Sequence, residues 1–138
     1  MTAGTLAALS EHPNICGVVD HSGQRRGTFL TLCALESELW TALSNGASGA
    51  VLPFASAAPY ATIALWEAFR TREEEAGLDW QSRVAPAAAV VNDRFGVAGL
   101  KHAMDLNGYY GGPPRLPWSS ISTAGKLEIE RAFADLKS

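Results

Sequence analysis

The sequence predicts an α/β protein in which a small parallel sheet is followed by a helical region. Three short apolar runs contain few polar interruptions, which is typical of strands buried on both faces. Helical spacing separates the second run from the third, and this alternation favours a parallel sheet. Three strands are too few to close an eight-stranded barrel. The predicted strands are residues 15–19, 28–33 and 49–54.

The helices of the first part are predicted from apolar spacing and from stop signals. A short N-terminal helix should end before Pro13, because the residue that precedes a proline disfavours the helical conformation. Residues 35–44 have helical spacing, and Asn45 with Gly46 supplies a left-handed stop. Beyond Ser56 we expect the chain to be helical to its end.

The chain is thus predicted to divide into residues 1–56, which hold the strands, and residues 57–138, a C-terminal helical region. On the first helix of the second part, large apolar side chains recur every three residues, which predicts a core or interface face. Gly77 is expected to end this helix and Asp79 to cap the next, which Pro86 should kink. The recurring residues are Tyr60, Ile63, Trp66 and Phe69.

Residues 109–118 contain two glycines and three prolines, which predicts an irregular loop. The loop should join a helix over residues 97–106 to a final helix capped by Ser122. Its paired glycines beside Arg115 could suggest an anion-binding loop, but the prolines lack amide donors and no phosphate-loop pattern is present. A packing or subunit-contact loop is the favoured interpretation.

Length and composition indicate one globular domain or a piece of one. The chain has 138 residues, of which 47% are hydrophobic and 18% charged, a composition that excludes a disordered chain. Eleven Lys and Arg oppose fourteen Asp and Glu, and no basic stripe is present, so nucleic-acid binding is not expected. Cys16 and Cys33 lie inside apolar runs, which predicts buried free thiols in a reducing compartment.

Neither a targeting signal nor a membrane span is expected. The N-terminal residues lack a basic region ahead of an apolar stretch. The longest near-apolar stretch, residues 51–66, is broken by Pro53 and Pro59 and falls short of the about 20 residues that a membrane-spanning helix needs. We therefore expect a soluble, cytoplasmic protein that has no membrane partner.

Four segments, in order along nearly the whole chain, resemble one enzyme family. Residues 12–23 read HPNICGVVDHSG, which resembles the segment H-P-N-I-x-G-x-K-D-S-S-G around the Schiff-base lysine of the dihydrodipicolinate synthase and N-acetylneuraminate lyase family. Residues 46–52 resemble that family's last barrel strand and the turn before it. Residues 94–101 and 108–117 resemble its C-terminal helical region, especially in members similar to 4-hydroxy-2-oxoglutarate aldolase.

The resemblance implies a partial (β/α) barrel, made of the family's last three strands and followed by a C-terminal helical extension. It therefore implies a truncated protein, without the strands that carry the family's paired threonines and its proton-relaying tyrosine. Residues 20–27 join the first strand to the second, and this connection is shorter than the about 10 to 12 residues that a parallel crossover with its helix needs. Either these strands pair antiparallel through a loop, or the second strand is displaced.

The position that matches the family's catalytic lysine is Val19. A class I aldolase needs an amine that condenses with the substrate carbonyl, and valine has none. The lysines of the chain are Lys101, Lys126 and Lys137, all in predicted helices. The resemblance therefore implies a pyruvate-type aldolase or lyase relative without catalysis or catalytic residues of its own, and without a cofactor. The alternative is an active carbon–carbon lyase that works as an assembled oligomer, with a lysine supplied from elsewhere.

Val19, Gly49 and Val51 are the residues that the resemblance places at a substrate position. The matching positions of Gly49 and Val51 use backbone groups near the substrate in the family, and the implied ligand is a small 2-oxo acid. Close packing is the other interpretation of these residues. The family's glycine after the second strand is replaced at Ala34 or Leu35, which would crowd a bound carboxylate.

Two further residue patterns are not expected to form sites. Asp20, His21 and Ser22 are consecutive, so their side chains cannot converge on one reacting atom as a catalytic triad requires. His12 and His102 are far apart, and no carboxylate or thiol is spaced to join them, so no metal site is expected.

Association with other chains is expected from the same partial barrel. Strands that are buried on both faces in a full barrel would here leave apolar edges and one uncovered face. Such surfaces tend to pair with other chains. We therefore expect self-association or association with an intact homologue.

Overall fold

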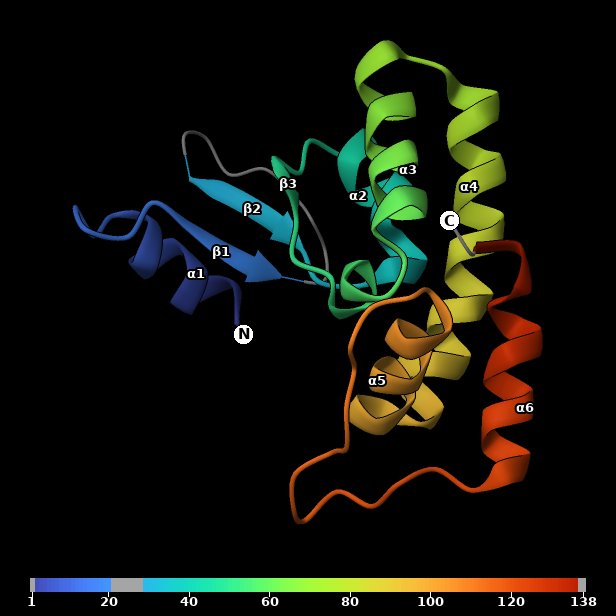
Figure 1. Ribbon diagram of the computed structural model, residues 1–138. Coiled ribbons are helices and arrows are strands. Elements are labelled where there is room, and N and C mark those ends of the chain that lie inside the picture. The colour runs from blue at the N-terminus through green and yellow to red at the C-terminus, as the bar shows by residue number, and fades with distance from the viewer. Residues whose placement is uncertain (1, 21–28, 137–138) are drawn as a thin grey trace.

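The structure is a computed structural model that describes residues 2–20 and 29–136 of the chain. Strands β1 (Gly17–Asp20), β2 (Leu30–Cys33) and β3 (Gly49–Ala50) form one sheet in that order. Figure 1 shows the sheet and α1 (Ala3–Ser10) on one side of the molecule, and most of the helices on the other. The predicted α/β class is therefore confirmed.

Both strand pairs of the sheet are parallel, so the antiparallel alternative is wrong. A Cβ added to Gly17 would lie 2.6 Å from the carbonyl oxygen of Leu30, so the close approach of β1 to β2 depends on glycine here. The connection that we expected to lack a crossover helix falls on residues 21–28, which lie outside the described residues.

The strands and helices of the first part begin and end close to the predicted positions. Helix α1 stops before Pro13 as expected, and Thr2 Oγ1 caps it by accepting a hydrogen bond of 3.2 Å from Thr5 N. Strand β3 is shorter than predicted, because Pro53 has no amide donor for the ladder and begins a 3₁₀ turn, Pro53–Ser56. A second 3₁₀ turn, Glu36–Glu38, replaces the start of the expected helix and leads into α2 (Leu39–Ser44).

The second part of the described chain is helical throughout, apart from its loop. Helices α5 (Gly96–Leu106) and α6 (Thr123–Ala132) match the predicted ones. The side chain of Ser122 caps α6 by accepting a hydrogen bond of 3.2 Å from Gly125 N. The elements are α3 (Pro59–Thr71), α4 (Glu74–Ala88), a π-helical turn (Ala89–Arg94), α5 (Gly96–Leu106), α6 (Thr123–Ala132) and a 3₁₀ turn (Ala134–Leu136). No helix within the described residues is long and apolar enough to cross a bilayer.

The predicted helix boundary at Gly77 is wrong. Helix α3 ends earlier, at Thr71, and its cap residue Arg72 has a left-handed φ of 63°. Helix α4 begins at Glu74, where acidic side chains favour a helix N-terminus. Gly77 lies inside α4, and a Cβ added there would lie 1.9 Å from the ring of Trp40. The expected cap at Asp79 is also inside α4. Gly77 is therefore needed for close packing rather than for ending a helix.

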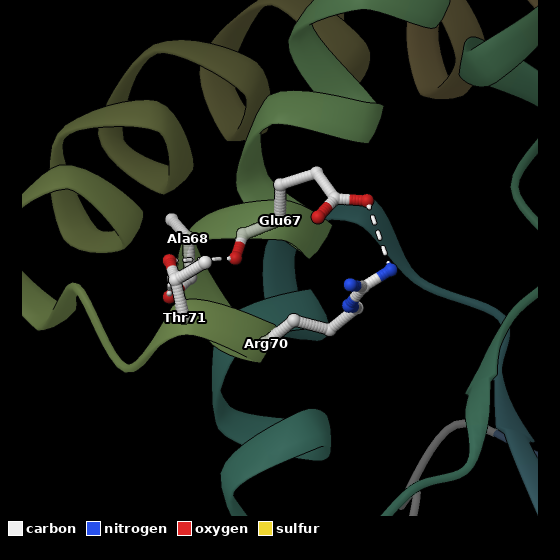
Figure 2. A network of polar contacts seen from close by, with 4 residues as sticks. All are labelled: Glu67, Ala68, Arg70 and Thr71. Carbon is white, nitrogen blue, oxygen red and sulfur yellow. Dashed lines mark hydrogen bonds and ion pairs between the residues drawn. The ribbon is translucent and has the colours of Figure 1, made fainter.

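The last turn of α3 is held by short-range polar contacts (Figure 2). Arg70 Nη1 lies 3.4 Å from Glu67 Oε1, and Thr71 Oγ1 donates hydrogen bonds to the carbonyl oxygens of Glu67 at 3.0 Å and Ala68 at 3.4 Å. Both charged side chains are largely exposed, so this ion pair stabilises the fold little.

The buried face of α3 differs from the predicted one. Tyr60 and Ile63 are 62% and 57% exposed, so the expectation of a core face is wrong for them. The buried residues are instead Ala61, Thr62, Leu65 and Ala68. Three of these are small, and small side chains let α3 approach its neighbours closely.

Two clusters of buried side chains form the core. The cluster beside the sheet includes Cys33, Leu43 and Leu65, and the larger cluster between the helices includes Phe54 and Phe133. Cys33 is fully buried as predicted, and its burial raises the pKa of the thiol. The prediction that Cys16 is buried is wrong: its thiol is exposed, because the residue precedes an edge strand.

Candidate functional site

The sheet has one covered face and one open face. Thr31 and Cys33 of β2 point toward the covered face and are 2% and 0% exposed. Val19 on β1, Leu30 on β2 and Val51 after β3 are large apolar residues that are 48%, 48% and 52% exposed. Parallel sheets are normally covered on both faces, so this sheet leaves apolar surface that a complete barrel would bury.

The structure brings together the three residues that the sequence placed at a substrate position. Val19 lies opposite Leu32 in the ladder between β1 and β2, and Leu32 lies opposite Gly49 in the ladder between β2 and β3. Val51 follows two residues after Gly49, and its amide donates a hydrogen bond of 2.8 Å to the carbonyl oxygen of Cys33. The parallel register therefore aligns Val19 with Gly49 in one row across the sheet.

Within the described residues, no amine lies on the sheet. Val19 presents only methyl groups, and the described lysines are Lys101 on α5 and Lys126 on α6. Lys101 Nζ is directed away from the sheet, to the carbonyl oxygen of Gly111 at 2.5 Å. A search of the described residues finds no group of three or more His, Cys, Asp or Glu side chains that could hold a metal ion.

A mostly apolar hollow of about 290 Å³ lies between β3 and α3. Gly49 and Ala50 border it from the strand, and Ile63 and Trp66 border it from the helix. Thr62 also lines the hollow, but its hydroxyl donates to the carbonyl oxygen of Ala58 at 3.0 Å. Because β3 is the last strand of the sheet, the hollow lies beside an open strand edge.

Glu36 is a buried carboxylate that the sequence reasoning did not single out. It follows the carboxyl end of β2 and is 8% exposed. Its Oε1 accepts hydrogen bonds from Phe54 N at 3.0 Å and from Asn92 Nδ2 at 2.9 Å, and its carbonyl oxygen accepts one from Gln81 Nε2 at 2.8 Å. A lone carboxylate directly after a buried strand was the signal in the sequence. These internal partners give Glu36 a role in joining the strand end to the helices.

Comparisons with known proteins find relatives that are named as lyases or synthases. No family model matches the chain. An uncharacterised DapA-like lyase of Halobacterium salinarum is 32% identical over 96% of this chain, and a 4-hydroxy-tetrahydrodipicolinate synthase of Exiguobacterium is 25% identical over 94%. These matches cover 46% and 47% of the relatives, so the chain spans about half of their length.

Solved structures show the same fold. Dihydrodipicolinate synthase from Bacillus anthracis aligns with a TM-score of 0.88 and 16% identity, over 98% of this chain and 50% of the other. The enzyme from Bacteroides thetaiotaomicron aligns with a TM-score of 0.76 and 20% identity, over 96% of this chain and 50% of the other. In sequence and in fold the chain is a relative of the dihydrodipicolinate synthase family, as the sequence motifs predicted. The narrower likeness to 4-hydroxy-2-oxoglutarate aldolase stays a prediction.

Proposed function

We propose that this stretch of chain is a partial (β/α) barrel of the Schiff-base lyase family that forms no imine of its own. The proposal is carried by Val19, which the family resemblance matches to the catalytic lysine and which lies half-exposed on the open face of the sheet. A Schiff base needs a primary amine within reach of the substrate carbonyl. Val19 has no such group, and the described lysines are in α5 and α6.

A small 2-oxo acid is the substrate class that we propose for the ancestral site. An Escherichia coli prophage protein of the dihydrodipicolinic acid synthase family, solved in complex with pyruvate, aligns with a TM-score of 0.69 over 79% of this chain. A 2-keto-3-deoxygluconate aldolase from Sulfolobus also shares the fold, with a TM-score of 0.74. In this chain Gly49 and Val51 remain at the proposed substrate position, whereas the reactive amine is replaced.

Borohydride trapping tests the proposal directly. The chain is incubated with pyruvate and reduced, and its mass is measured. We expect no pyruvyl adduct, while a 4-hydroxy-tetrahydrodipicolinate synthase that has the family lysine, used as the positive control, should gain one. A stoichiometric adduct on any lysine of this chain would overturn the proposal.

The variant Val19→Lys sharpens the same test. It places an amine at the carboxyl end of a parallel strand, where barrel enzymes carry their chemistry. Because the resemblance places the family's proton-relaying tyrosine on strands that this stretch does not match, we expect slow trapping of pyruvate and no aldol cleavage above background. Val18→Lys is the matched control, since the neighbouring side chain points to the opposite face. Cleavage of 4-hydroxy-2-oxoglutarate by the Val19 variant at about 1 per second, which is typical of working enzymes, would contradict the account.

A second candidate is a lyase that works only in an assembly. The observation in its favour is the open sheet face together with the outer edges of β1 and β3, which pair with no further strand among the described residues, so that strands from another chain could add there. In that case the lysine comes from the partner. Release of pyruvate from 4-hydroxy-2-oxoglutarate, measured for this chain alone and after mixing with an intact relative that keeps the family lysine but is inactive by itself, separates the two candidates. Activity that arises only in the mixture supports the second.

A further inference from the structure

A polar hollow of about 220 Å³ lies in the helical part, between α5, the loop over residues 107–122, and α6. It is lined by other residues than the open sheet face and the hollow beside β3. Drug-sized ligands occupy pockets of about 300 to 1,000 Å³, so this hollow suits a smaller molecule. Its polar lining residues are Lys101, His102, Asp105, Ser120 and Lys126.

The imidazole of His102 is the unusual group of this hollow. Its side chain is 15% exposed, and its Nε2 atom is buried without a hydrogen-bond partner. The nearest carboxylate oxygen, Glu130 Oε1, lies 3.9 Å away, which is too far for a hydrogen bond. Buried polar atoms are almost always paired, so the unpaired nitrogen is unusual, and the imidazole that carries it borders the hollow.

Two ammonium groups accompany this imidazole. Lys101 Nζ uses one of its three N–H groups to donate a hydrogen bond of 2.5 Å to the carbonyl oxygen of Gly111. The ammonium of Lys126 has no hydrogen bond or ion pair with the part of the chain that the structure describes. The lining carboxylate, Asp105, accepts a hydrogen bond of 2.8 Å from Gly111 N. With two cations and one carboxylate, the lining is formally positive even when His102 is neutral.

We propose that this hollow binds a small tetrahedral oxyanion, either inorganic phosphate or the phosphate group of a small monoester. The donors are the ammonium groups of Lys101 and Lys126 and the hydroxyl of Ser120, and the imidazole of His102, when protonated, adds a positive charge beside them. Lysine binds phosphate as a point charge, and donors from three separate segments suit an anion whose oxygens point in several directions. Glu130 lies beside the imidazole but does not line the hollow, so it favours the imidazolium without facing the anion.

The proposal predicts that binding is coupled to proton uptake. Without the anion, burial and the charge of Lys126 lower the pKa of His102, against the weaker opposite effects of Glu130 and Asp105. An anion in the hollow stabilises the charged imidazole that borders it and therefore raises this pKa. By linkage, the anion must bind more tightly as the pH falls. Sulfate keeps its charge over this pH range, so it reports the titration of the protein alone.

The test is a titration of the whole chain with sulfate, followed by the NMR signals of the amides and of the His102 imidazole at constant ionic strength. We expect saturable shifts at the residues of the hollow, and binding at least about threefold tighter near pH 5.5 than near pH 7.5. Inorganic phosphate and glycerol phosphate form two further arms. If inorganic phosphate binds more tightly than glycerol phosphate, free phosphate is the ligand, and the reverse order identifies the ester. Equal affinities of the two mean that the hollow recognises the oxyanion that they share.

Three variants distinguish the hollow from general attraction to cations. Lys126→Gln should weaken sulfate binding about fivefold, an effect typical of losing one partly exposed charge. Arg70→Gln is the matched control, because it removes the same charge from the exposed pair of α3 (Figure 2) and should leave binding unchanged. His102→Gln should still bind sulfate but should lose the pH dependence.

Three results would each overturn the proposal. The first is the lack of a saturable shift at about 100 mM sulfate, where screening of exposed charges is already strong. The second is equal weakening of sulfate binding by Lys126→Gln and Arg70→Gln. The third is a pH dependence of sulfate binding that persists in His102→Gln. If His102→Gln does not fold, the pKa of the His102 imidazole is measured in the wild-type chain with and without sulfate instead. A pKa of His102 that rises with sulfate supports the site, and one that does not change contradicts it.

Discussion

The helical part and the strand-bearing part of the molecule differ in how their apolar side chains are covered. Between the helices, Phe54, Phe133 and Ile129 are fully buried by residues from the same chain. On the sheet, Val19 and Leu30 remain about half-exposed, although Phe29 and Thr31, the chain neighbours of Leu30, are buried. A helix hides its apolar stripe against one neighbour, whereas a parallel strand needs a neighbour on each face. The helical part therefore completes its own core, and the sheet does not.

The largest effect is expected in the core of the helical part. Phe133→Ala removes a fully buried ring that packs edge-to-face on Phe54, with ring centres 5.8 Å apart. We expect the free energy of unfolding to fall by about 3 to 5 kcal/mol, measured by urea denaturation. Leu127→Ala, on the same helix but 48% exposed, should cost about 1 kcal/mol or less. Equal losses for the two variants would show that the helical core is not complete by itself.

A smaller loss is expected where the two parts meet at Gly77. Gly77→Ala places a methyl group against the ring of Trp40, which must move. We expect the free energy of unfolding to fall by about 1 to 3 kcal/mol, as for other overpacked sites. Gly4→Ala in α1 has nothing within 4 Å of the added Cβ and should be neutral or slightly stabilising. A stabilising Gly77→Ala would mean that α2 and α4 pack less closely than described.

The open face of the sheet should affect association more than stability. The double variant Leu30→Ser and Val51→Ser removes exposed apolar groups, so we expect weaker self-association with a change in unfolding free energy below about 1 kcal/mol. Ile63→Ser, which removes a similar exposed group from α3, is the control. Light scattering at tens of micromolar measures the self-association, because exposed apolar surfaces associate at concentrations of this order. A wild-type chain that is monomeric there contradicts the prediction.

The smallest effect concerns pH and the helical part alone. Burial lowers the pKa of His102 in the folded state below its ordinary value of 6.5, so the unfolded chain binds more protons there. The contribution of this residue to stability is therefore present above pH 6.5 and is lost as the pH falls through the folded pKa. His102→Gln should flatten this part of the profile, measured by denaturation in buffers free of oxyanions. An unchanged profile would mean that His102 is not effectively buried.

Local patterns predicted most of the elements. The three strands follow from apolar runs and the start of α6 from Ser122, because each signal lies within the element or next to it. Gly77 was misassigned because its contact, Trp40, is 37 positions away along the chain (77 minus 40), and no local signal reveals it. The exposure of Cys16 depends on which strands flank β1, which its own sequence does not state.

The candidate substrate site stays a prediction, although the structure brings its residues together. The family motif identified Val19, Gly49 and Val51, and the parallel register aligns the first two through Leu32. The short connection over residues 20–27 suggested an antiparallel alternative, since loop length alone does not define strand direction. The structure shows that β1 and β2 pair in parallel. The hollow around His102 was missed because three segments form it, and none carries a motif.

Glu36 has a consequence for how the molecule unfolds. One carboxylate oxygen accepts from Phe54, on the first side of the predicted division at residue 56, and from Asn92, on the second side. Gln81 adds a further link, from α4 to the carbonyl oxygen of Glu36 and to the amide of Trp40. If either side unfolded first, buried donors and an acceptor on the other side would lose their partners at once. The two sides are therefore coupled thermodynamically, and heating should melt them in a single cooperative transition.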